Sequence, residues 1–188
     1  LTSQGVPMDD VAVLYLSSDP NATFVEDNTV NLSCPSPTAT TATELVGSGT
    51  TSAFHVTTSV PVTAYDIFPF GGAYSHFPAA ELLYPSSAWG TNYVVLATPK
   101  GTSPTQRLKY ADILASADGT SVTFEPVVAL PGGGGLSAVA ANTQTTFTLD
   151  AGEYAHWETP AASNDLSGSI VLATKPVSLT AGSEFFRL

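Results

Sequence analysis

The sequence predicts an all-β fold, with sandwich-like antiparallel sheets formed from two imperfectly duplicated halves. Several segments alternate apolar and polar residues with the two-residue period of half-buried strands, and proline- or glycine-rich breakers separate them. Charged residues make up only 11% of the chain against 43% hydrophobic residues. Exposed helix faces are usually rich in charged residues, so this composition favours short strands joined by turns.

The alternation predicts six strands in chain order, at residues 9–18, 52–60, 91–98, 120–127, 143–150 and 168–181. In the first segment Val11 and Val13 fall on the same side. In the second, Phe54 and Val56 share one side, which puts His55 on the opposite, solvent-facing side.

One segment, residues 105–118, offers a helix as an alternative, because Tyr110, Ile113 and Leu114 recur at helical spacing. We predict a strand at 111–116 instead. Asp118-Gly119 followed by a β-prone run is a hairpin signal, and a hairpin needs a strand before its turn.

The run "PGGGGL" at residues 131–136 predicts a flexible hairpin tip. It is no phosphate-binding loop, because neither a Lys-Ser/Thr pair nor a helix follows it.

We expect one β domain over residues 1–188, either complete or cut from a larger protein. Its halves are predicted at about 9–65 and 110–182, with an aromatic-rich bridge at 66–100. The evidence is internal likeness: residues 16–32 resemble 114–130, and the two β-rich stretches leading into Pro61-Val62 and Pro176-Val177 resemble each other.

Charge and cysteine content narrow the class of protein. Sixteen acidic residues against five basic ones give a net charge of −11, which disfavours nucleic acid and anionic membranes as partners. No apolar run reaches the roughly 18 residues of a membrane span. Cys34 is the only cysteine, so no internal disulfide forms. This composition is typical of an exported protein with an acidic, hydroxyl-rich surface.

Between residues 45 and 182 the chain resembles a known family. The segments "FHVTTSVPVTAYDIFPFGG", "LLYPSSAWGTNYVVLAT", "ADILASADGTSVTF", "FTLDAGEYAHWE" and "DLSGSIVLATKPVSLTAG" follow one another as in the IgGFc-binding protein N-terminal-like domain. That domain occurs in mucus-associated animal proteins and in large exported bacterial proteins. The resemblance implies an extracellular β module, and it does not carry over immunoglobulin binding.

Nothing in the sequence indicates catalysis or a cofactor. There is no Gly-x-Ser-x-Gly elbow, and His55, His76 and His156 are too scattered for a zinc site. Calcium remains a minor alternative at acidic turns such as Asn164-Asp165, although no Asp-x-Asp-x-Asp-Gly loop is present. We therefore predict no enzyme activity, no metal and no cofactor.

The candidate binding surface is the aromatic stretch "PVTAYDIFPFGGAYSHFP" at residues 61–78, in which a Gly-Gly pair allows a tight loop. Its rings either pack in the core or face a ligand, and pattern alone leaves both alternatives open. Trp157, flanked by His156 and Glu158, is expected at the surface. The predicted ligand-binding residues are Phe70, Tyr74, His76, Phe77, Trp89 and Trp157.

The predicted function is a non-enzymatic extracellular or cell-surface module for adhesion, whose partners are proteins, glycans, neighbouring domains or copies of itself. The first alternative is a structural subunit of a surface filament or layer that assembles through its edge strands. The second is a carbohydrate-active enzyme domain, for which the sequence nominates no pair of carboxylates.

Overall fold

A computed structural model describes residues 6–7, 10–16, 23–26, 30–33, 40, 45–68, 79–97 and 108–183. The chain divides into two compact units, the first formed by residues 1–44 and 60–83, the second by residues 45–59 and 84–188. The predicted halves at 9–65 and 110–182 within a single domain stay a prediction.

The described residues of the first unit form two antiparallel pairs of strands. β1 (Thr23–Glu26) pairs with β2 (Val30–Ser33), and β4 (Ala64–Phe68) pairs with β5 (Ala79–Leu83). Each pair is a two-stranded sheet of its own.

Two predicted strands are wrong over most of their length. Residues 10–16 include no named strand, and Val11 is 79% exposed. Of the strand predicted at 52–60, only Ser52 belongs to one, at the end of β3 (Gly49–Ser52). His55 is exposed, as predicted, but Val56 is exposed too. Alternation marks a strand only where a neighbouring strand supplies hydrogen bonds and a core covers one face.

The second unit holds, within its described residues, a seven-stranded antiparallel sheet curled into a half-barrel. Its order is β3-β10-β7-β11-β8-β9, with β6 also paired to β11. Besides β3, the strands are β6 (Gly90–Val94), β7 (Lys109–Ala115), β8 (Thr120–Glu125), β9 (Thr145–Leu149), β10 (Glu153–Glu158) and β11 (Ile170–Ser183). The described chain also has one short 3₁₀ turn, η2 (Ser86–Ala88). The all-β prediction and the four later predicted strands are confirmed, as is a strand over most of 111–116.

The predicted hairpin at Asp118-Gly119 is wrong. β7 and β8 do not pair with each other. Both run antiparallel to β11, β7 along Val177–Ser183 and β8 along Ile170–Ala173. The chain therefore turns a corner at residues 116–119 and continues along the same neighbour. A turn sequence such as Asp-Gly predicts that the chain changes direction at that point. Whether the two flanking strands then pair with each other depends on the other strands available to them.

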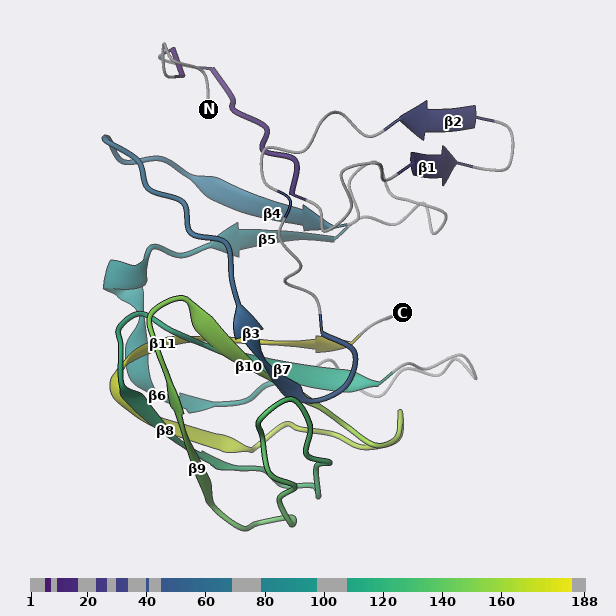
Figure 1. The fold of residues 1–188 in the computed structure, drawn as a ribbon, viewed down its shortest axis with the longest axis vertical. Coiled ribbons are helices and arrows are strands. Elements are labelled where there is room, and N and C mark those ends of the chain that lie inside the picture. The colour runs from purple at the N-terminus through teal and green to yellow at the C-terminus, as the bar shows by residue number, and fades with distance from the viewer. Residues whose placement is uncertain are drawn as a thin grey trace. The chain divides into compact units, whose positions relative to one another are not determined.

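Two neighbouring segments bend at the same place. β9 pairs with β8 and β10 with β7, so residues 145–158 follow residues 109–125 past the corner. β11 shifts register against β6 between Leu172 and Val177. We call residues 109–125, 145–158 and 170–183 the three bent segments. Figure 1 shows their bends at the same end of the sheet, where they fold it into a half-barrel.

Hydrogen bonds between the turns hold this corner. The backbone N–H of Gly119 donates to Asp150 Oδ1 over 2.8 Å, and the N–H of Ala151 donates to Asp118 Oδ1 over 3.0 Å. Each aspartate thus caps the turn that carries the other. From β11, Lys175 Nζ donates to the carbonyl of Asp118. We call this arrangement the aspartate clamp.

The core lies on the concave inner side of the three bent segments. Trp157 is fully buried, with its ring centroid 5.6 Å from that of Phe124 and 6.0 Å from that of Phe147. Among the described residues, the same core cluster also contains Val95, Ala111, Ile113, Ala115, Val122, Leu130, Leu136, Val139, Leu149, Ala155, Leu166, Val171 and Val177. Every one of these residues belongs to the second unit, so this unit has a continuous core of its own.

The glycine run is a hairpin tip, as predicted, because Leu130 and Val139 form an antiparallel bridge outside that of Gly133 and Leu136. It is a docked turn, however, and not a flexible one. Gly133 and Leu136 exchange two backbone hydrogen bonds, and Gly134 O accepts from the N–H of Thr50 in β3. A Cβ on Gly134 would lie 2.8 Å from the Cα of Gly49. The absence of side chains allows this turn to cover the outer edge of β3.

The two Pro-Val steps lie in different environments. Val62 is 60% exposed and precedes β4, whereas Val177 is fully buried within β11. Their likeness in sequence is therefore not matched by a likeness in structure at these positions.

We predict that Asp150→Ala lowers the free energy of unfolding by about 1 kcal/mol, because the N–H of Gly119 loses its acceptor. Asp150→Asn keeps an acceptor oxygen at that position and should lose less than half as much. Urea denaturation of the two variants beside the wild type measures this. Equal losses in both variants would contradict the hydrogen-bonding role.

Gly134→Ala should destabilise the fold more than Gly119→Ala does. Both glycines have positive φ, +49° and +61°, so both alanines incur about 1 kcal/mol of backbone strain. A Cβ on Gly119 has nothing within 4 Å, whereas one on Gly134 meets Gly49. The clash adds about 1–3 kcal/mol, so we expect the Tm of Gly134→Ala to be several degrees lower. Equal Tm values would show that the turn is not tightly docked.

Candidate functional site

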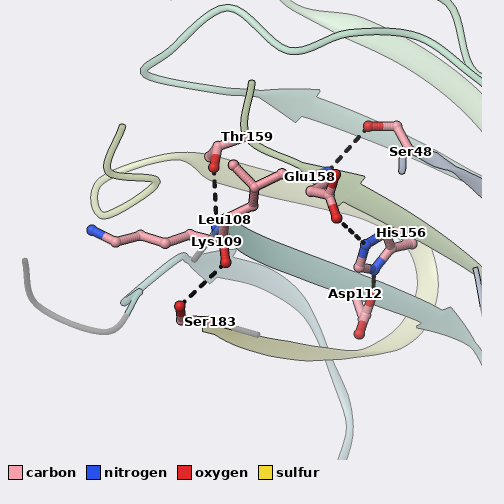
Figure 2. Close-up of polar contacts among 8 residues, drawn as sticks. All are labelled: Ser48, Leu108, Lys109, Asp112, His156, Glu158, Thr159 and Ser183. Atoms are coloured by element: carbon pink, nitrogen blue, oxygen red, sulfur yellow. Dashed lines mark hydrogen bonds and ion pairs between the residues drawn. The ribbon is translucent and has the colours of Figure 1, made fainter. Parts of the chain in front are cut away.

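The outward side of β7 and β10 carries a partly buried histidine between two carboxylates. His156 Nδ1 lies 2.6 Å from Asp112 Oδ1, its direct cross-strand neighbour, and His156 Nε2 lies 4.0 Å from Glu158 Oε2. The side chains are 13% exposed for His156, 29% for Asp112 and 17% for Glu158. Figure 2 shows the imidazole pointing between the two acids, and we call these three residues the histidine cluster.

The neighbours of this cluster fix its geometry. The Tyr110 ring lies 5.5 Å from the imidazole, and Ser48 Oγ accepts from the backbone N–H of Glu158 over 3.1 Å. A carboxylate only accepts hydrogen bonds, so the short contact to Asp112 places a proton on His156 Nδ1. The cluster can thus offer a fixed, polar and partly accessible contact to a partner.

A lysine is buried at the end of β7. Lys109 is only 3% exposed, and its Nζ has no hydrogen-bond partner among the residues that the structure describes. Its backbone is well held, since its N–H donates to Thr159 Oγ1 and its carbonyl accepts from the N–H of Thr159. Nearby, Ser183 Oγ donates to the carbonyl of Leu108 (Figure 2).

Asp165 lies close enough to Lys109 for their charges to attract. The backbone N–H of Ser167, 2.9 Å from Asp165 Oδ1, is the main cause that lowers the pKa of this carboxyl below its usual 3.8, and the charge of Lys109 adds to it. Since the folded pKa is lowered, the stabilisation is present at neutral pH and is lost as the pH falls below 3.8.

The sheet also has an exposed apolar surface. Val94 in β6 is a direct neighbour of Ile170 in β11, and Leu172 lies two residues further along β11. Val94 is 60% exposed, and Leu96, just after β6, is 80% exposed. Val95, between them, is fully buried, so alternate side chains of this segment point outward. We call Val94, Leu96, Ile170 and Leu172 the outer strip.

Two rings lie directly before β6 in the chain. Tyr84 is 69% exposed, and Trp89 is half-buried. Trp89 Nε1 donates to the carbonyl of Tyr84 over 3.1 Å, which closes the short loop around η2. This bond satisfies the indole N–H, and the phenol ring of Tyr84 stays open to solvent.

Only two predicted ligand-binding residues lie among the described residues, Trp89 and Trp157. The other four, Phe70, Tyr74, His76 and Phe77, lie outside them. The prediction that Trp157 lies at the surface is wrong, because it is the largest fully buried side chain of the core. Its neighbours His156 and Glu158 suggested exposure, but on a strand they point to the opposite face.

Sequence reasoning missed the outer strip and Lys109. In "NYVVLA" apolar residues occupy both faces of the strand, so alternation could not tell which side is buried. For Lys109 a signal was present: it lies two residues before the strand predicted at 111–116, and in β7 it faces the same side as the buried Ala111 and Ile113.

Within the part of the chain that the structure describes, no group of three or more His, Cys, Asp or Glu side chains, the histidine cluster included, is arranged so that it could hold a metal ion. Asn164-Asp165, a calcium alternative in the sequence, forms a turn in which the carboxylate accepts from Ser167. Among the described residues there is also no helix long and apolar enough to cross a membrane.

Lys109→Met should raise the free energy of unfolding by about 1 kcal/mol or more. Methionine has nearly the same length, and it removes an ammonium that is buried without a hydrogen-bond partner among the described residues. The attraction to Asp165 is lost as well, but that carboxylate is exposed, so this loss is smaller than the gain. The matched control is Lys175→Met, which loses the bond to Asp118 and should be slightly destabilised. Urea midpoints measure both. A larger loss in Lys109→Met than in Lys175→Met would show that the buried charge is compensated.

The comparisons with known proteins agree with this fold. The model of the family described as IgGFc binding protein matches residues 79–188, more than half of the chain. This range holds β5 to β11, including the outer strip and the histidine cluster. The search of curated proteins and the search of solved structures found no match. An all-β chain matched by this family model over most of its second unit therefore belongs to the IgGFc-binding protein family, a family of binding-type domains.

Proposed function

We propose that the chain is a non-enzymatic extracellular or cell-surface module that binds a protein or glycan partner through the outer side of its half-barrel. The main evidence for this proposal is that the apolar side chains of the outer strip and the ring of Tyr84 are exposed. Membership of a binding-type family supports the same class of function.

The exposure of the outer strip favours binding over a role in packing. Val94 and Leu96 stay 60% and 80% exposed, although the same sheet buries Val95 and Val171 completely. Contiguous exposed apolar side chains on a soluble domain usually mark an interaction surface. The sheet beneath them is held by hydrogen bonds on both sides of β11, so the surface is pre-formed.

Aromatic side chains supply the second part of the proposed surface. Tyr84 and Trp89 are its members; Phe70, Tyr74, His76 and Phe77 stay separate candidates for ligand binding on the evidence of the sequence, and they lie outside the described residues. Flat rings stack on sugars and are common among the residues that dominate protein interfaces. This composition is compatible with both partner classes.

The family description names the Fc region of IgG as a ligand, which makes an Fc fragment the first protein to test. Binding of that particular ligand is not part of the proposal. A glycan array tests the other partner class.

Tyr84→Ala should weaken binding to the Fc fragment, or to any glycan that the array identifies, by about tenfold in Kd. An exposed ring that acts as a hot spot contributes about 1.4 kcal/mol or more. Surface plasmon resonance with the immobilised ligand measures the effect. Val46→Ala is the matched control, because Val46 is 97% exposed and lies outside the outer strip.

Two results would contradict the proposal. In one, Val46→Ala weakens binding as much as Tyr84→Ala does. In the other, mass spectrometry shows that a bound glycan is cleaved, which would favour a carbohydrate-active enzyme.

A further inference from the structure

Within the described residues, β6 has one paired edge and one free edge. Val95, which directly follows β6, donates its N–H to Ser169 O over 2.8 Å, and its carbonyl accepts from the N–H of Gly168 over 2.9 Å. Both groups of Val95 therefore face the β11 side. In an extended strand the neighbouring residues face the other way, so Asn92, Val94 and Leu96 direct their backbone groups to the free edge. Within the described residues, β6 pairs with no strand besides β11.

In the part of the chain that the structure describes, nothing covers this edge, and its own residues do not protect it. Residues 90–97 include no charged residue and no proline. By contrast, the outer edge of β3 is covered by the glycine turn, whose Gly134 O accepts from Thr50. Proteins normally cover, charge or interrupt a free edge, because its backbone groups can pair with another strand. An open and uncharged edge is therefore a place for an added strand.

The side chains at this edge are apolar and exposed. Val94 and Leu96 point outward beside Ile170, which is 41% exposed. A strand added to β6 would place its own outward side chains next to them, at the separation of cross-strand pairs. The partner strand should therefore be uncharged and carry β-branched or other apolar residues on that face.

We propose that the added strand is β6 of a second copy of this chain, paired antiparallel across a two-fold axis. Pairing Val94 with Val94 of the other copy places each Asn92 opposite a Leu96. This register joins all the outward backbone groups of these residues in about six hydrogen bonds, two for each pair. The two outer strips then form one continuous surface. The inference rests on the proposed function, because it assigns a partner to the same strip.

The charge of the chain does not act at the contact itself. Each copy has a net charge of −11, but residues 90–97 are uncharged, so the repulsion between copies is long-range. Salt screens charges over about 8 Å at physiological ionic strength. Dimerisation should therefore strengthen as salt is raised, opposite to an interface made of ion pairs.

Sedimentation equilibrium of the whole chain, from about 1 to 200 μM, tests the dimer. We expect the wild type to dimerise and Val94→Lys to raise the dimer Kd at least tenfold, since two lysines would face each other. Leu172→Lys is the matched control: it adds the same charge to the outer strip but lies on β11, away from the edge, and should still dimerise. If Val94→Lys folds poorly by circular dichroism, Leu96→Lys at the 80% exposed position replaces it.

A crosslink tests the register. In a Cys34→Ser background, Val94→Cys should give a disulfide-linked dimer under mild oxidation, because Cα atoms in a hydrogen-bonded pair are about 5.5 Å apart. Leu172→Cys should give none. A wild type that stays monomeric, one that forms a ladder of larger species, or a Leu172→Lys variant as impaired as Val94→Lys would each overturn the inference.

The measurements of dimerisation and of ligand binding test this inference and the proposed function independently of each other. A monomeric chain that binds the Fc fragment or a glycan overturns the dimer and leaves the binding module standing. A dimer that binds neither supports edge pairing and removes the evidence for the module's other partners.

Discussion

The aspartate clamp at the common corner is the interaction on which the rest of the second unit depends. Asp118 and Asp150 each accept a backbone N–H from the turn that carries the other, so the two turns are fixed against each other. Lys175, in the third bent segment, donates to the carbonyl of Asp118 and so connects this segment to the same corner. Because all three segments bend together, a sheet that would otherwise extend becomes a half-barrel with an inner and an outer side.

The curvature separates two kinds of surface. The inner side buries Trp157 and Phe124 in a continuous core, and large rings there remove much apolar area from water. The outer side is left to polar residues such as the histidine cluster, except along β6 and β11, where the outer strip is exposed. A binding-type family and an open apolar strip on a rigid sheet together favour recognition by the outer side.

Two outer edges of the sheet, at β3 and at β6, differ in whether described residues cover them. β3 is covered by a turn that only glycines can form so closely, as the short distance between Gly134 and Gly49 requires. β6 has no such cover among the described residues, and no charge within residues 90–97 protects it. This difference within one sheet is the physical basis for assigning a strand partner to β6.

The sequence by itself determined the all-β class, the strands β6, β7, β8, β9 and β11 and the family, because alternation and breakers act locally and recur along the chain. It did not predict β10 (Glu153–Glu158) as a strand. It did not determine which strands pair, and so a corner at Asp118-Gly119 looked like a hairpin. Nor did it place Trp157 inside, or Val94 and Leu96 outside, since both faces of their strand are apolar in sequence. Only the tertiary structure decides these points, because pairing and burial depend on strands distant in the chain, as β11 is from β6, β7 and β8.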